Sequence, residues 1–147
     1  MNRFRFRFAS VLRYREILED ERKRDFGIAL DHLSHEEDKL EKIGGDISLH
    51  EKKMEKSRLG KVSIHDLQNK FIYARHLDGE KDAQEKQIVK SKGVLESKRE
   101  ELVESMKKKK IFERLKERDI DKYNEETKRE EMTQNDEFAS QRFNECS

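Results

Sequence analysis

The residue types that could do chemistry are few in this chain, and the densest group is His32, His35 and Glu36. Residues three and four positions apart lie on one face of a helix, so two imidazoles and a carboxylate would point the same way. Such side chains are ligands for zinc. No further cluster of histidine or cysteine supports them, however, and such a pair on a charge-rich helix is usually solvated. We therefore expect no metal site and no cofactor.

Catalytic constellations are also missing from the sequence. The chain contains no glycine-rich phosphate-binding loop, and the extended helices predicted below could not hold a Ser/His/Asp arrangement rigidly. The one cysteine, Cys146, excludes an internal disulfide and suits a reducing cytosol. We predict that the protein is not an enzyme.

Four consecutive lysines, Lys107–Lys110, form the strongest local concentration of positive charge. Such a run can bind nucleic acid or acidic lipid. No aromatic residue interleaves it as a stacking platform for bases, so a solvated helix face is favoured over a nucleic-acid site. Glutamates also flank the run on both sides: Glu100, Glu101, Glu104, Glu113 and Glu117.

The first 15 residues combine aromatic rings with arginines. Phe4, Phe6 and Phe8 alternate with arginine, and no acidic residue occurs before Glu16. A protein-binding surface, a membrane-surface anchor and a disordered segment are all compatible with this composition. Protein binding is favoured, because aromatic residues and arginine are enriched in the hot spots of interfaces.

Composition restricts the elements that can position these residues. Charged residues make up 46% of the 147, but 34 positive and 33 negative charges leave a net charge of only +1, which argues against disorder by self-repulsion. The chain also has few apolar residues, which suits a seam between two helices better than a globular core. The absence of proline agrees with long helices, and no apolar run approaches the roughly 18–20 residues of a membrane span.

A 3-4 alternation of the kind that forms coiled coils defines a first helix. It continues backwards through polar interruptions at Glu19 and Arg22, and fails near Gly60. Gly60 is predicted to end the helix in the left-handed conformation, and Ser63 with Asp66 to cap the next one. The seam positions are Phe8, Leu12, Arg15, Glu19, Arg22, Phe26, Ala29, Leu33, Glu36, Leu40, Ile43, Ile47, His50 and Met54.

A second and longer helix follows, with apolar positions from Leu67 to Tyr123. We predict an all-α fold, an antiparallel two-helix coiled coil forming a single domain over residues 1–147 with flexible termini. The helices should span about 10–58 and 64–140, joined by a turn at about 59–63, with soft points at the glycines Gly44, Gly45, Gly79 and Gly93. The apolar positions of the second helix are Leu67, Phe71, Ala74, Ile88, Leu95, Leu102, Met106, Phe112, Leu115, Ile120 and Tyr123.

Each end of the chain carries a distinctive motif. The start reads Phe4-x-Phe6-x-Phe8-x2-Val11-Leu12-x-Tyr14-Arg15-Glu16. The end reads Phe112-Glu113-Arg114-Leu115-x2-Arg118, then Tyr123, Lys128-x-Glu130 and Asp136-Glu137-x-Ala139-x2-Arg142. Together these motifs resemble those of the flagellar export protein FliJ family. Arg7 stands where many members have proline, which leaves the start of the first helix open.

This resemblance implies a soluble component of the bacterial flagellar type III export apparatus, similar in fold to the stalk of rotary ATPases. It implies binding in the pore of the hexameric export ATPase (FliI), contact with the membrane export gate (FlhA) and a role in recycling export chaperones. The expected location is the cytoplasmic face of the inner membrane at the flagellar base, reached through partners, and no nucleic acid is expected as a ligand. A stalk protein of a virulence type III secretion system, and a generic coiled-coil scaffold or chaperone, remain alternatives.

The resemblance also implies binding residues. Those expected to bind the ATPase lie near the two termini: Phe4, Phe6, Phe8, Val11, Leu12, Arg13, Phe112, Leu115 and Arg118. The nearest candidates for binding the export gate are Phe71, Ala74 and Leu77. As a hypothesis, Lys107–Lys110 form a collar that meets acidic residues at the mouth of the ATPase ring.

Overall fold

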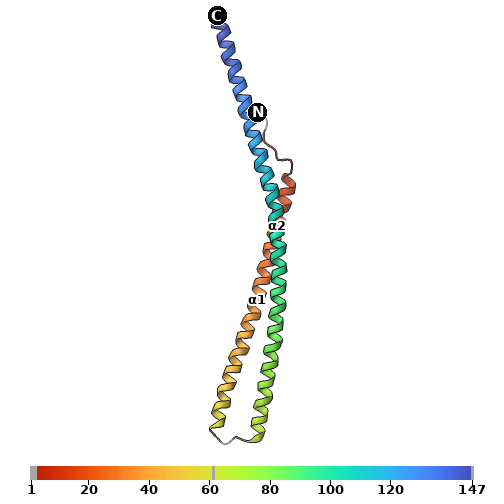
Figure 1. The fold of residues 1–147 in the computed structure, drawn as a ribbon, viewed down its shortest axis with the longest axis vertical. Helices are drawn as coiled ribbons and strands as arrows, with labels where there is room; N and C mark the ends of the chain where they lie inside the picture. The colour runs from red at the N-terminus through yellow and green to blue at the C-terminus, as the bar shows by residue number, and fades with distance from the viewer. Residues whose placement is uncertain (1–2, 61, 147) are drawn as a thin grey trace. The chain divides into compact units, whose positions relative to one another are not determined.

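Two α-helices make up almost all of the computed structural model, which describes residues 3–60 and 62–146 (Figure 1). Helix α1 spans Ala9–Arg58 and helix α2 spans Ile64–Cys146. No strand occurs among the described residues. The all-α fold with a longer second helix is confirmed, and α2 continues beyond the expected end at about 140. Lys61, in the predicted turn, and the terminal residues 1, 2 and 147 lie outside the described part of the chain.

The helices contribute to two compact units, which are described separately. The hairpin unit is Glu21–Leu102, and the terminal unit combines Met1–Asp20 with Val103–Ser147. Within the hairpin unit the helices run antiparallel: Gln84 bonds Glu36, whereas His50 reaches the backbone of Lys70, nearer the connection between the helices. The organisation as a single domain stays a prediction.

Hydrogen bonds between residues three positions apart close the end of α1. The amide of Leu59 donates to the carbonyl of Lys56 at 3.3 Å, and that of Gly60 to the carbonyl of Ser57 at 3.4 Å. No described glycine has a positive φ, so the left-handed conformation predicted for Gly60 is wrong. The physical reason is that bonds spanning three residues tighten the last turn and satisfy its carbonyls without a left-handed residue.

The start of α2 is capped by Ser63. Its hydroxyl oxygen accepts a hydrogen bond from the amide of Asp66 at 3.2 Å, and its carbonyl accepts one from the amide of Leu67 at 3.1 Å. The serine part of the predicted cap is therefore confirmed.

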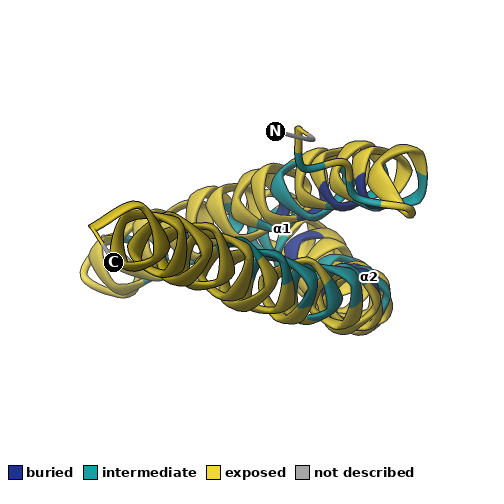
Figure 2. Ribbon diagram, turned by 90° about the horizontal axis from the view of Figure 1, so that it is seen from above, coloured by how far each residue is buried: buried dark blue, intermediate teal, exposed yellow. Residues whose placement is uncertain are grey.

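The predicted 3-4 alternation is the buried and half-buried stripe of α1 from Leu12 to Met54. On α2 the prediction is wrong at Phe71 and Met106, which are exposed. Exposed residues cover most of the surface, and buried and half-buried ones form narrow stripes (Figure 2). In the hairpin unit the buried residues are Ala29, Glu36, His50, Leu77, Ile88 and Ser91. Three of these six, Glu36, His50 and Ser91, are polar, so the seam is not a continuous apolar core. Both helices continue through their glycines without interruption.

Specific partners satisfy the polar groups of this stripe. The Gln84 amide donates to the carboxylate of Glu36 at 2.5 Å and to its backbone carbonyl at 2.8 Å. The imidazole Nε2 of His50 bonds the carbonyl of Lys70 at 3.0 Å, and its ring lies 4.9 Å from that of Tyr73. The hydrogen bond from Gln84 lowers the pKa of Glu36 below its ordinary value of 4.5, burial opposes this shift, and Lys39 adds to it.

Acid should weaken the hairpin unit through Glu36. Because the folded-state pKa of Glu36 is lowered, this residue contributes to the free energy of unfolding above pH 4.5. That contribution is lost as the pH falls through the folded-state pKa. We expect Glu36→Gln to flatten the pH dependence of the free energy of unfolding between pH 5 and pH 3, as measured by urea denaturation. The exposed neighbour in Glu37→Gln is the control, and equal slopes for both variants would contradict the assignment.

Leu77 is only 3% exposed, whereas Phe71 is 61% exposed. Leu77→Ala should therefore lower the free energy of unfolding by about 2–3 kcal/mol, since it removes buried methyl groups and leaves a void. Phe71→Ala removes a larger side chain but should change stability by less than about 0.5 kcal/mol. Denaturant titration followed by circular dichroism compares the two, and the opposite order of stabilities would contradict the packing described here.

Candidate functional site

The N-terminal aromatic side chains pack on α2 within the terminal unit. The ring of Phe4 lies 5.6 Å from that of Tyr123, and the ring of Phe8 lies 6.0 Å from that of Phe112. Phe6 contacts Phe8 edge-on at 6.0 Å. Tilted and edge-to-face ring pairs at these distances are favourable beyond the area that they bury. The segment before α1 is thereby attached to α2 by its aromatic side chains.

The alternation of phenylalanine with arginine separates the two residue types by exposure. Phe4 and Phe6 are half-buried, while Arg3, Arg5 and Arg7 are exposed. No strand forms over this segment, in agreement with its short alternation. The rings stabilise the terminal unit, and the guanidinium groups remain available to a partner.

The remaining predicted ATPase-binding residues also divide into apolar side chains that are at least half-buried and arginines that are exposed. Leu12 is buried, and Val11, Phe112 and Leu115 are half-buried. Arg13 and Arg118 are exposed. All nine residues belong to the terminal unit. The apolar members therefore mostly hold the unit together, and the arginines and the outer part of Phe8 are accessible.

A charge pair lies in the interface of the terminal unit and was missed by the sequence analysis. The Lys109 ammonium lies 2.9 Å from Oε2 of Glu19, whose side chain is only 5% exposed, and 3.6 Å from Glu113. The hydrogen bond to Glu19 raises the pKa of Lys109 above its ordinary 10.5, although burial opposes the shift. The prediction of a wholly solvated lysine run is wrong at this residue. The available signal was spacing, because Lys109 lies between Ser105 and Phe112 in the 3-4 alternation.

The other lysines of the run are exposed. Lys107 and Lys110 continue into Arg114 and Arg118 as a row at 3-4 spacing along α2. None of these four side chains makes an ion pair with a described residue. Farther along, residues 124–147 carry seven acidic and three basic side chains. The terminal unit thus presents a cationic surface that is followed by an acidic, almost wholly exposed helix.

The three candidate gate-binding residues do not share one accessible surface. Phe71 is exposed, Ala74 is half-buried, and Leu77 lies in the seam between the helices. Leu77 is therefore inaccessible to a partner while the hairpin is closed. The exposed apolar residue next to Phe71 is Ile72, which the sequence analysis did not consider.

His32 and His35 are engaged by protein groups. Nδ1 of His32 lies 3.3 Å from the Ser91 hydroxyl, and Nδ1 of His35 bonds the carbonyl of Asp31 at 2.8 Å. Among residues 3–60 and 62–146, no group of three His, Cys, Asp or Glu side chains is arranged to hold a metal ion. Neither helix, as far as it is described, contains a stretch long and apolar enough to cross a membrane.

A family model described as Flagellar FliJ protein matches residues 4–146, nearly the whole chain. No curated protein and no solved structure matches.

Removing the cation of the buried pair should destabilise the terminal unit. Lys109→Gln removes the ammonium that lies 2.9 Å from the Glu19 carboxylate. The expected cost is about 1–3 kcal/mol, less than for a fully buried pair, because the Lys109 side chain is partly exposed. Thermal and urea unfolding would measure the loss.

Lys110→Gln, one residue away and exposed, is the matched control and should unfold like the unmodified protein. The double variant Glu19→Leu with Lys109→Leu should regain most of the lost stability, because it removes both charges together. If Lys109→Gln matched its control, the pair would have no structural role.

Proposed function

The chain belongs to the FliJ family of flagellar type III export components, and from this we propose that it binds the hexameric export ATPase (FliI) through its terminal unit. In this proposal it promotes assembly of the ATPase ring and ATP hydrolysis, and is not itself an enzyme. The match to a flagellar family favours this role over a virulence secretion stalk or a generic coiled-coil scaffold.

The attachment of the N-terminal segment to α2 is the observation that supports this proposal most directly. The Phe4–Tyr123 and Phe8–Phe112 contacts join the two stretches that carry the family motifs into one unit. That unit exposes cations on both helices, with Arg13 on α1 and Arg118 on α2. An elongated helical element bearing exposed arginines is suited to contact several subunits of a surrounding ring.

Further contacts are proposed for the hairpin unit. Phe71, exposed near the start of α2, is the candidate for binding the export gate (FlhA), and Ala74 and Leu77 would support it from the seam. These partners would hold the protein at the cytoplasmic face of the inner membrane at the flagellar base. Recycling of export chaperones would be a further role of the same protein.

The test adds the purified chain to its organism's export ATPase and follows hydrolysis and ring formation. We expect stimulation to saturate at about one copy per six ATPase subunits, as expected for one element in a closed sixfold ring. Arg13→Glu with Arg118→Glu should weaken binding about tenfold or more while the helical circular dichroism stays unchanged.

The control variant reverses two exposed cations of the hairpin unit, Lys52→Glu with Arg75→Glu, and should stimulate normally. Absence of both binding and stimulation with an active ATPase would contradict the proposed function. Normal stimulation by the Arg13/Arg118 variant would instead reject only the proposed surface. Leu12 is unsuitable for this test because it is buried and its substitution would disturb folding.

A further inference from the structure

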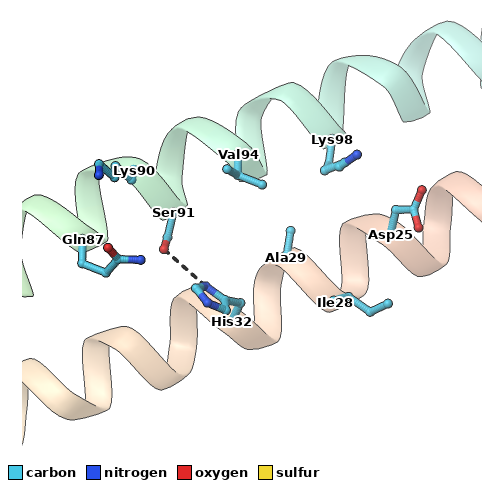
Figure 3. A pocket seen from close by; sticks show the side chains of 9 residues that line it. All are labelled: Asp25, Ile28, Ala29, His32, Gln87, Lys90, Ser91, Val94 and Lys98. Carbon is cyan, nitrogen blue, oxygen red and sulfur yellow. Dashed lines mark hydrogen bonds between the residues drawn. The ribbon is translucent and has the colours of Figure 1, made fainter.

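An open groove of about 560 Å³ runs along the seam of the hairpin unit (Figure 3). Two small residues, Ala29 on α1 and Ser91 on α2, are the buried members of its lining. Ser91 reaches His32 through a hydrogen bond of 3.3 Å. Because neither Ala29 nor Ser91 is large enough to fill the space between the helices, the interface is open to one side at this level.

Apolar side chains border the groove on both helices. Ile28 on α1 is 68% exposed and Val94 on α2 is 54% exposed. In the close-up they lie on opposite ribbons, Ile28 next to Ala29 and Val94 next along from Ser91 (Figure 3). Covering both would remove apolar surface from water, at about 25 cal/mol per Å². The groove therefore has an apolar centre that the chain itself leaves uncovered.

Charge differs between the two edges of the groove. Lys90 and Lys98 line the α2 edge, whereas Asp25 lines the α1 edge. Asp25 is paired with Arg22 at 3.6 Å and Lys98 with Glu101 at 3.5 Å. Lys90 makes no ion pair with a described residue, so the α2 edge retains a cation that a partner could neutralise.

The spacing of the lining residues suits a helix as the occupant. On α2 they recur three and four residues apart, at Gln87, Lys90, Val94 and Lys98, and on α1 at Asp25, Ile28 and His32. Two such rows along a helix pair form the surface on which a third helix packs in a coiled coil. Helix-in-groove binding uses apolar anchors at the same spacing on the ligand.

We propose that this groove binds an amphipathic helix of a partner protein. The apolar stripe of that helix inserts between Ile28 and Val94, above Ala29 and Ser91. Its acidic edge lies along Lys90, the cation of the α2 edge that has no ion pair among the described residues. The proposal does not rest on the ATPase-binding role, because every residue of the groove belongs to the hairpin unit and every predicted ATPase-binding residue to the terminal unit.

The test uses the full-length chain and a labelled synthetic helix as the probe. The peptide has about three heptads, with leucine at the core positions, glutamate along one flank and lysine along the other. Fluorescence anisotropy should show saturable binding. The double variant Ile28→Ser with Val94→Ser should weaken it at least about tenfold, because it removes both apolar borders.

Val89→Ser is the matched control, since Val89 is an exposed valine of α2 (70%, against 54% for Val94) that does not line the groove. It should bind the peptide like the unmodified chain. Lys90→Glu should weaken binding, and a peptide with lysine on both flanks should bind the unmodified chain less tightly than the original peptide. Circular dichroism confirms that each variant keeps its helices.

Equal binding by the Ile28/Val94 variant, or an equal loss in the Val89 control, would overturn the proposal. Sedimentation of the chain without peptide distinguishes another occupant. If the unmodified chain self-associates and the Ile28/Val94 variant does not, the groove accepts a second copy of this chain and the proposal of a partner protein is wrong.

Discussion

Pairing of polar side chains across a narrow seam is the constraint on which the rest of this structure depends. An apolar 3-4 seam alone tolerates displacement by a whole heptad, because equivalent residues would still meet. A heptad displacement would break two polar contacts, Glu36 with Gln84 and His50 with the carbonyl of Lys70. It would leave buried polar groups without partners. In the terminal unit, Glu19 with Lys109 acts in the same way. These pairs select the antiparallel register at the expense of apolar contact.

A seam of this kind leaves much apolar surface uncovered. Two helices can bury only one stripe each, so residues such as Ile28, Phe71 and Val94 remain exposed. Small residues within the seam, Ala29 and Ser91, open it further into a groove. The small buried area that limits stability therefore also leaves accessible apolar sites along the chain.

The terminal unit combines attachment and recognition in a few residues. Phe4 and Phe8 pack against Tyr123 and Phe112, so the accessible recognition groups are mainly the neighbouring arginines, together with the outer part of Phe8. This division follows from chemistry: a ring gains free energy from burial, whereas a guanidinium loses its hydration if buried without a partner. A family motif that reads as a surface of aromatic residues is therefore largely internal here.

The sequence by itself determined the features that depend on local periodicity. The 3-4 alternation from Leu12 to Met54 predicted the buried stripe of α1, Ser63 predicted the start of α2, and the terminal motifs predicted the family. Tertiary structure alone decided which residues meet across the seam: Lys109 with Glu19, Gln84 with Glu36, and Leu77 in the interior instead of on a binding surface. It also decided the conformation of Gly60. The physical reason is that a helical period states which face of a helix is buried, whereas the opposing residue depends on the register of a second helix, which no pattern within one helix contains.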